Sequence, residues 1–379
     1  MIEVQVKDLS RGGAGVSKDP GGRVVFIPYT MPGDVVSVEI VQENKHYAQG
    51  ELIEILKPSP DRVSPPPCPV FGKCGGCEWQ HVPYSLQWET KVKGVMHALK
   101  RVNVALPLII EEFPAQKVWE YRNRIQLRGF RDQIGFYTSK SHDLVSIDKC
   151  FIAHPLINFN LCKIKADGSK LEKFYKVEVT VTNTQQEVLQ TIWNAPHGAL
   201  GFRQINFEQN EKLKHWIAEN LTPNNVRSLK HNVVLYDLYG GNGNLSLDLI
   251  SNFKQIYCVD THIPSEEEIE TLCVSGNYQF CKSSVLSWLI RQRKKNMLSA
   301  HGSAILDPPR EGLGSEFREI VLALDELKVN EVIIVGCDVD AFVRDISKFI
   351  KRDWKLKKIA IFDFFPQTHH VESVALMEK

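Results

Sequence analysis

The stretch LYDLYGGNGNLSLDLI, residues 235–250, decides the fold of this 379-residue chain. Its apolar start predicts a buried strand, its three glycines a tight turn, and the leucines that follow a helix. Strand, glycine turn and helix bring backbone N–H groups close to a ligand in parallel α/β domains. Asp260 ends the next apolar run, where an acidic residue commonly binds a ribose. The stretch predicts either an adenosine-type ligand or a tight turn without one.

Bulk composition is that of an ordinary globular protein, with 43% hydrophobic and 24% charged residues. The formal charge of +1 gives no overall basic signal, so nucleic-acid contacts would have to come from local patches. We see no signal peptide and no apolar run of membrane-spanning length, and therefore expect no membrane partner. Nine cysteines, an odd number, without a secretion signal favour a reducing compartment and a cytoplasmic location.

Residues 1–57 alternate between apolar and polar positions, with turn signals at RGGAG, DPGG and MPGD. About five short strands in so few residues predict a compact β-barrel of the OB type, which commonly binds oligonucleotides. The alternative is a purely structural barrel. Residues 58–69 contain six prolines and predict an extended linker.

Three cysteines in CPVFGKCGGCEWQH, Cys68, Cys74 and Cys77, have the spacing of metal ligands, and Cys150 is the best candidate for a fourth. Both zinc and an iron–sulfur cluster accept four cysteines, so the spacing alone does not choose between them. His81 is a possible zinc ligand, but we interpret it as a surface histidine.

Basic residues accumulate in the middle of the chain. Residues 84–105 predict a helix with a basic face that includes Lys91, and residues 119–147 interleave arginines with aromatic residues. Arginine beside aromatic residues suits RNA, although an ordinary exposed sheet explains the pattern as well. We interpret residues 58–200 as a central β-rich domain.

From residue 201 to 379, strands alternate with helices, which predicts a doubly wound sheet with its ligands beyond the carboxyl ends of the strands. Reactive groups follow such strands at Asp237, Asp260, Asp307 and Cys337. A final antiparallel hairpin, expected at the sheet edge, begins its second strand near Glu372. A cysteine at a strand tip can act as a nucleophile and a carboxylate as a base, so group transfer is the predicted chemistry.

Several motifs recur in the order of a known family: CPVFGKCGGCEWQH with Cys150, FRQIN, DLYGGNGN, DPPR, GCDVDAFVRD and THHVES. Together they resemble the class I RNA (uracil-5-)-methyltransferases, which make 5-methyluridine in ribosomal or transfer RNA. The resemblance covers almost the whole chain, since residues 1–57 resemble the TRAM domain of many members. It implies a Rossmann-like methyltransferase domain with an N-terminal TRAM barrel and a central iron–sulfur domain.

The resemblance also implies residue roles. Cys337 would add to C6 of uracil, C5 would take the methyl group of S-adenosylmethionine, and Glu372 would remove the C5 proton. The cofactor site would be formed by Gln204, Tyr239, Asn244, Asp260 and Asp307. The target base would be bound by Phe202, Gln204, Asp307 and Arg310. The four cysteines match the family's ligands for a 4Fe–4S cluster.

The chain departs from the family pattern at Gly240, where a cysteine is common, and at Asp338 and Val339, where asparagine and proline follow the nucleophile. Asp338 would place a negative charge beside Cys337 and raise its pKa. The third adenine contact falls on Ser283 or Ser284. We expect a monomer acting on ribosomal RNA; transfer RNA, a cytosine C5 target and an RNA-binding protein with a degenerate methyltransferase domain are the alternatives.

Overall fold

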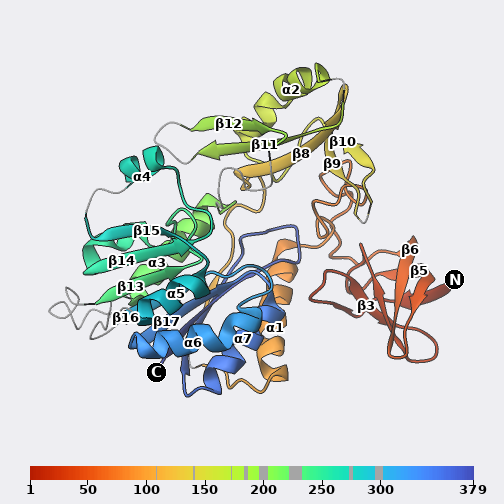
Figure 1. Cartoon of the computed structure of the whole chain (residues 1–379). Helices are drawn as coiled ribbons and strands as arrows, with labels where there is room; N and C mark the ends of the chain where they lie inside the picture. Colours follow the sequence, from red (N-terminus) through yellow and green to blue (C-terminus); the bar gives the residue numbers. More distant parts are fainter. Residues whose placement is uncertain are drawn as a thin grey trace.

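The computed structural model describes residues 1–107, 109–139, 141–171, 173–182, 187–195, 204–221, 233–272, 276–294 and 302–379. These residues form three β-sheets, which Figure 1 shows as three bodies following one another along the chain. Among the described residues, no helix combines the length and the apolar character needed to cross a bilayer.

The N-terminal sheet has six strands in the order β1-β5-β6-β4-β3-β2. Their bounds are β1 Ile2–Gln5, β2 Asp8–Leu9, β3 Gly15–Lys18, β4 Val24–Ile27, β5 Val35–Glu43 and β6 Tyr47–Lys57. Alternate residues point inward and bury a small apolar core, as period-two patterning requires. The side chain of Arg62 pairs with the fully buried Asp34 at 2.6 Å, which fixes the linker against this sheet.

The cysteine-rich segment packs between the N-terminal sheet and helix α1 (Tyr84–Arg101). Trp79 is fully buried beside Leu9 and Met31, and its indole N–H donates to the carbonyl of Gly13 at 2.8 Å. Arg11 and Arg101 both pair with Asp340, so charged contacts join the N-terminal sheet and α1 to the C-terminal part of the chain.

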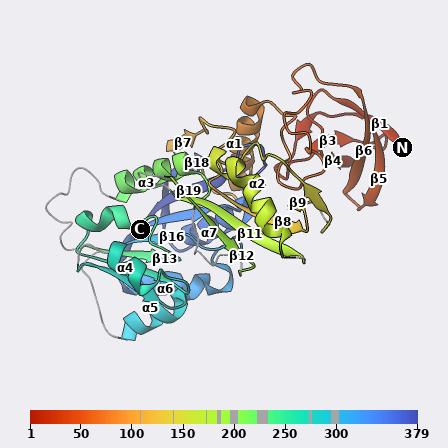
Figure 2. The same ribbon diagram turned by 90° about the horizontal axis from the view of Figure 1, so that it is seen from above.

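The central sheet has five strands in the order β10-β9-β8-β11-β12, all antiparallel, and carries helix α2 (Pro155–Ser169) on one face (Figure 2). The strands are β8 Arg124–Phe130, β9 Gln133–Tyr137, β10 Leu144–Ser146, β11 Tyr175–Thr182 and β12 Val188–Trp193. Of the arginines expected to face RNA, Arg124 forms a largely buried ion pair with Glu178 at 2.7 Å. Arg128 and Arg131 lie over the rings of Tyr137 and Phe130.

The C-terminal sheet has eight strands in the order β15-β14-β13-β16-β17-β19-β18-β7. They are β7 Ile109–Phe113, β13 Val234–Leu238, β14 Gln255–Asp260, β15 Tyr278–Lys282, β16 Gly302–Leu306, β17 Val329–Gly336, β18 Lys355–Phe362 and β19 Glu372–Glu378. From β13 the chain winds to β14 and β15 on one side, then returns to β16 and β17 on the other. The order therefore reverses between β13 and β16, which is where such sheets bind ligands.

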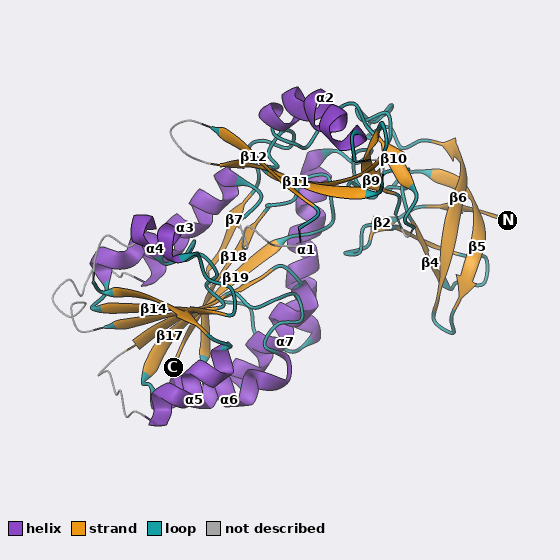
Figure 3. Ribbon diagram, turned by 45° about the horizontal axis from the view of Figure 1, so that its top comes forward, coloured by secondary structure: helices purple, strands orange, loops and turns teal. Residues whose placement is uncertain are grey.

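Helices cover both faces of this sheet, as Figure 3 shows. One face packs against α1, α5 (Val285–Lys294), α6 (Phe317–Glu326) and α7 (Val339–Ile350). The other packs against α3 (Phe207–Leu221), and the short α4 (Glu266–Leu272) lies nearby. A parallel sheet buried on both faces explains the near-continuous apolar runs of its strands.

One prediction about this sheet was wrong. The β18–β19 hairpin is antiparallel as expected, but it is not at the edge, because β19 lies between β17 and β18. The edge belongs to β7, which comes from the 58–200 segment and pairs in parallel with β18. The boundaries 1–57, 58–200 and 201–379 remain predictions; the structure adds that α1 and β7 pack with the C-terminal sheet.

The helix expected after the glycine turn is also different. Residues Leu247–Asn252 form a 3₁₀ helix. A local hydrogen bond explains this, because Ser246 donates its hydroxyl to Asp237 instead of starting a regular helix. The glycine turn therefore presents backbone N–H groups without a long helix behind it.

Candidate active site

Three carboxylates lie at the carboxyl ends of neighbouring strands. Asp237 belongs to β13, Asp260 ends β14 and Asp307 follows β16, and β13 pairs with both other strands. Burial, reinforced by the charges of Asp237 and Asp260, raises the pKa of Asp307 to about 7. Acidic groups crowded in this way favour a ligand that carries positive charge.

Asp237 stabilises the glycine turn through a hydrogen bond from Ser246, which follows the turn. Its side chain is fully buried and accepts a hydrogen bond from Ser246 Oγ at 2.5 Å, while that oxygen lies 2.8 Å from the hydroxyl of Tyr278. Burial raises the pKa of Asp237 to about 6. Ser246 and Tyr278 were not predicted, because the first lay within the helix-like pattern and the second within an apolar strand.

Asp260 stabilises the glycine turn through the backbone of the turn. Its carboxylate accepts hydrogen bonds from the backbone N–H of Gly241 at 3.1 Å and of His262 at 2.8 Å. The hydroxyl of Thr261 donates a third hydrogen bond at 3.3 Å. Two carboxylate oxygens have about four lone-pair sites, so capacity remains for a ligand hydroxyl. Tyr239 adopts a left-handed backbone with φ +64° at the start of the turn.

Asn244 ends the turn and exchanges two amide hydrogen bonds with Asn210 of α3, at 2.8 and 3.0 Å. The two serines considered for the adenine contact have different local partners. The N–H of Ser283 donates to the carbonyl of Asp260 at 2.9 Å, and the hydroxyl of Ser284 donates to that of Ser287 at the start of α5 at 2.8 Å. Which serine contacts adenine stays a prediction.

Sheet register places Cys337 and Glu372 next to each other. Gly336 of β17 pairs with Ser373 of β19, so continuing the antiparallel register by one residue sets Cys337 opposite Glu372. Side chains directly opposite on antiparallel strands point to the same face, with Cβ atoms about 4.5–5.5 Å apart. Cys337 is half-buried and Glu372 is 4% exposed.

Both groups are protonated more readily than usual in the free protein. Burial, with Glu372 and Asp307 nearby, raises the pKa of the Cys337 thiol to about 12. Burial and the charge of Asp307 raise the pKa of Glu372 well above its ordinary value. Arg310 opposes both shifts. Asp338, expected to raise the pKa of Cys337, instead caps α7 by accepting a hydrogen bond from Ala341 N–H at 2.8 Å.

Two residues expected at the site are less directly placed. Gln204 is 9% exposed and lies where the central sheet joins α3; its carbonyl accepts from the amide of Asn123 at 3.1 Å. The structure shows no contact that assigns its side chain to cofactor or base. Phe202 lies outside the described residues.

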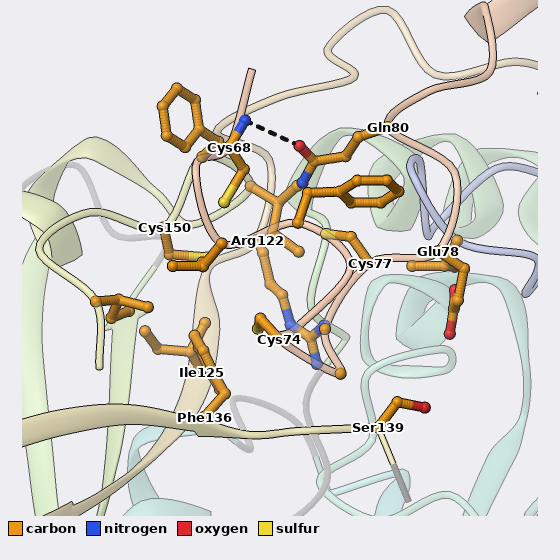
Figure 4. A pocket seen from close by; sticks show the side chains of 18 of the residues that line it. Cys68, Cys74, Cys77, Glu78, Gln80, Arg122, Ile125, Phe136, Ser139 and Cys150 are labelled. Carbon is orange, nitrogen blue, oxygen red and sulfur yellow. Dashed lines mark hydrogen bonds between the residues drawn. The ribbon is translucent and has the colours of Figure 1, made fainter. Parts of the chain in front are cut away.

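A cavity of about 560 Å³ is lined by all four predicted cysteines, Cys68, Cys74, Cys77 and Cys150. Figure 4 shows them around a common space into which Arg122 extends. The amide of Gln80 accepts from Cys68 N–H at 3.1 Å. The lining of this cavity also includes Arg310, Phe365, Thr368 and His370. The cavity therefore extends to the loop that follows β16 and to the turn between β18 and β19.

Burial is the main cause of raised thiol pKa values here, taking Cys77 to about 12. The other cysteines of the cavity raise it further, so the thiols lie close enough to repel one another as thiolates. Gly75 cannot carry a Cβ without approaching Ser139 N and Tyr137 O to 3.1–3.2 Å, which explains a glycine at this place.

Within the ranges that the structure describes, no three His, Cys, Asp or Glu side chains converge as a metal-ion site. His81 was wrongly interpreted as a surface residue: it is fully buried, packs near Phe71, and does not line the cysteine cavity.

Two family models match parts of the chain. The TRAM domain model matches residues 1–53, and the tRNA (Uracil-5-)-methyltransferase model matches residues 293–379, which include the Cys337 and Glu372 strands. The C-terminal part of the chain is therefore similar to RNA (uracil-5-)-methyltransferases, and the N-terminal part is similar to a TRAM domain.

Relatives match along the whole chain. An RNA methyltransferase of Bdellovibrio bacteriovorus is 28% identical, covering 99% of this chain and 94% of the relative. A 23S rRNA (uracil(1939)-C(5))-methyltransferase of Histophilus somni is 27% identical, covering 99% and 95%. The crystal structure of a Pyrococcus abyssi tRNA (uracil-54, C5)-methyltransferase with S-adenosyl-L-homocysteine has a similar fold, with a TM-score of 0.69, 21% identity and 99% of both chains covered.

One departure from the family pattern has a structural explanation. A Cβ at Gly240 would lie 2.6 Å from the sulfur of Cys258 and 2.7 Å from the carboxyl of Asp237. In this chain, Cys258 of β14 occupies the space that a cysteine at position 240 would need.

Proposed function

We propose that this chain transfers the methyl group of S-adenosylmethionine to C5 of a uridine in RNA. The observation that carries the proposal is the register that sets Cys337 opposite Glu372, next to the acidic end of β13, β14 and β16. The match of residues 293–379 to the tRNA (Uracil-5-)-methyltransferase model supports the same reaction.

Cys337 acts as the nucleophile. Its sulfur forms a bond to C6 of the uracil, and the electrons of the C5–C6 double bond make C5 nucleophilic. Because the pKa of the Cys337 thiol is raised to about 12, this thiol must lose its proton when the uracil binds. The positive charge of Arg310 favours that loss. The target base must leave its stack to reach a half-buried sulfur.

Glu372 acts as the base in the second half of the reaction. Once C5 carries the methyl group, the carboxylate takes the C5 proton, the C5–C6 double bond re-forms, and the C6–sulfur bond breaks. We expect Glu372→Gln to lower turnover by about 10²–10⁴-fold. An SDS-stable protein–RNA band carrying labelled methyl groups should accumulate; slow turnover without that band would contradict the role of Glu372.

The acidic strand ends suit S-adenosylmethionine, which supplies an electrophilic methyl group and carries a positive sulfonium. Asp307, whose pKa is raised by burial and its acidic neighbours, gains a counter-charge from such a ligand. Asp260 has a lone pair free for a ribose hydroxyl. We assign Tyr239, Asn244 and Gln204 to the same site, and Phe202 and Arg310 to the base.

For the substrate we propose ribosomal RNA, which the name of the Histophilus relative supports. Exposed arginine–aromatic pairs on the central sheet, such as Arg131 over Phe130, suit single-stranded RNA. Transfer RNA is the alternative substrate. Mapping the position of 5-methyluridine distinguishes the two.

A direct test uses purified protein, methyl-labelled S-adenosylmethionine and total RNA that lacks 5-methyluridine. We expect labelled 5-methyluridine at one position of ribosomal RNA after nuclease digestion and mass spectrometry. Label in 5-methylcytidine, or RNA binding without any transfer, would overturn the proposal. Label confined to transfer RNA would overturn the substrate assignment alone.

For the cysteine cavity we propose a 4Fe–4S cluster held by Cys68, Cys74, Cys77 and Cys150. Four thiols sharing one cavity, which raise one another's pKa, suit a cationic metal centre that stabilises thiolates. Both a 4Fe–4S cluster and a tetrahedral zinc site accept four thiolates, and the resemblance of the cysteine motif to the family's cluster ligands favours the cluster. Anaerobically purified protein should be brown, with about four irons and four sulfides per chain; colourless protein with stoichiometric zinc would refute the cluster.

A further inference from the structure

The turn that closes the β18–β19 hairpin controls the placement of Glu372. Phe362, the last residue of β18, pairs with Glu372, the first residue of β19. The turn between them runs from residue 363 to 371. Because a hairpin's turn fixes its register, this turn determines whether Glu372 lies opposite Cys337.

Gln367 is the most constrained residue of that turn. It has a left-handed backbone, φ +69°, and its side chain is 3% exposed. Its N–H donates to Gln87 Oε1 at 2.9 Å, and its side-chain oxygen accepts from Gln87 Nε2 at 3.1 Å. Its carbonyl accepts from the backbone N–H groups of Glu78 at 3.1 Å and Trp79 at 3.0 Å.

Gln87 of α1 connects this turn with the cysteine segment. The side chain is 1% exposed. Its amide shares two hydrogens among three oxygens: that of Gln367 and the carbonyls of Trp79 at 3.1 Å and Val82 at 2.8 Å. A single buried amide thus binds both the turn and the segment that directly follows Cys77.

Helix α1 reaches the turn a second time, one helical turn later. Lys91, predicted to lie on a basic surface, is instead fully buried and pairs with Asp363 at 2.7 Å. Its ammonium also donates to the carbonyl of Phe365 at 3.0 Å. Residues four apart share a helix face, so Gln87 and Lys91 hold the turn together.

We propose that Gln87 and Gln367 are positioning residues that couple the cysteine segment to Glu372. A correctly formed cysteine loop then fixes the turn, the turn fixes the hairpin register, and the register sets the base against the nucleophile. The inference rests on the proposed function, because it assigns the coupling to the step in which Glu372 removes the C5 proton.

The test compares Gln87→Leu with Thr90→Val on the same helix. Thr90 is a matched control, because its hydroxyl donates to the carbonyl of Leu86 within the helix and not to the turn. We expect kcat of Gln87→Leu to fall about 10- to 100-fold, since displacement of a catalytic group by about 1 Å can cost that much. KM for RNA should change less than about threefold, and the methylated protein–RNA adduct should accumulate as the base becomes slow.

Gln87→Glu supplies a second readout, which also serves if the leucine variant fails to fold. Its carboxyl can donate to Gln367 Oε1 only when protonated, so relative to wild type its kcat should recover as the pH is lowered. Binding of S-adenosylhomocysteine and thermal unfolding check that each variant is folded.

Three results would overturn the coupling. They are a raised KM with unchanged kcat in Gln87→Leu, a kcat loss without adduct accumulation, and a Gln87→Glu profile parallel to wild type. Each presupposes that the wild-type protein methylates RNA at uridine C5; absence of that activity refutes the proposed function instead.

Discussion

The two halves of the proposed active site differ in the charges that surround their reactive groups. The cofactor half, at the ends of β13, β14 and β16, gathers three aspartates, and the charged neighbours that shift Asp307 are both acidic. The acceptor half, at the ends of β17 and β19, sets Cys337 and Glu372 beside Arg310, which lowers the pKa of both. The first half needs a cationic ligand to relieve its repulsion. The second has its own cation and can generate a nucleophile.

The largest expected effect is loss of methyl transfer after substitution of the nucleophile, with binding of the cofactor almost unchanged. Cys337→Ala should lower methyl transfer by about 10⁴-fold or more, because the covalent route is lost. Binding of S-adenosylmethionine, measured by calorimetry, should stay within about twofold, since the thiol lies in the acceptor half. Cys162→Ala, an exposed cysteine on α2, is the control. Full activity in Cys337→Ala would remove the nucleophile assignment.

Arg310→Gln should have the next largest effect. Loss of the guanidinium raises the pKa of Cys337 further, and each unit lowers the thiolate fraction tenfold. We therefore expect kcat/KM at pH 7 to fall about 10- to 100-fold, partly through lost contact with the base. In the wild type, kcat/KM should rise with pH from 7 to 9, since the thiol pKa lies near 12. A flat profile would mean that the thiol is not deprotonated in the rate-limiting step.

The cofactor half should show a smaller effect that depends on ligand charge. Because the pKa of Asp307 is about 7, its carboxylate forms between pH 6 and 8. Affinity for S-adenosylmethionine should rise about tenfold over that range, as expected when a ligand prefers the ionised form of one group. S-adenosylhomocysteine, which lacks the sulfonium, should respond less, and Asp307→Asn should flatten the response. Equal slopes for both ligands would contradict this view.

Stability should show the smallest change, in the free protein. The pKa of Asp237 is raised from 3.8 to about 6 by burial, so the folded state prefers the neutral acid. The contribution of Asp237 to the free energy of unfolding is therefore fully present below pH 4. It is lost as the pH rises through 6, by up to about 3 kcal/mol. Asp237→Asn should lack this loss, so its melting temperature relative to wild type should be higher at pH 8 than at pH 4.5. The same difference at both pH values would exclude a buried charge as the cause.

The sequence predicted the positions of the residues at the strand ends better than the contacts that support them. Cys337, Asp307 and Asp260 each follow an apolar strand, so their place at one sheet edge follows from parallel topology. Periodicity could not reveal that β7 pairs with β18, because those strands are distant in the chain. It placed the last hairpin at the edge for the same reason.

The burial of several polar side chains also could not be predicted from the sequence. Lys91 looked like a surface charge because its partner, Asp363, lies 272 residues further along the chain. His81 and Gln87 also gave no local sign of burial. Their environments arise from long-range packing, which periodicity within one helix or loop does not contain.

The chain leaves the C-terminal sheet after β7 and returns to it at α3, so the central sheet is tethered at both of its ends. A body on one tether can rotate about a single hinge, whereas two tethers restrict it to motions that bend both crossings together. The cysteine cavity lies beside one of those crossings, at Arg122 and Ile125. We therefore expect the central sheet to keep its place relative to the C-terminal sheet when RNA binds, with small shifts at both crossings.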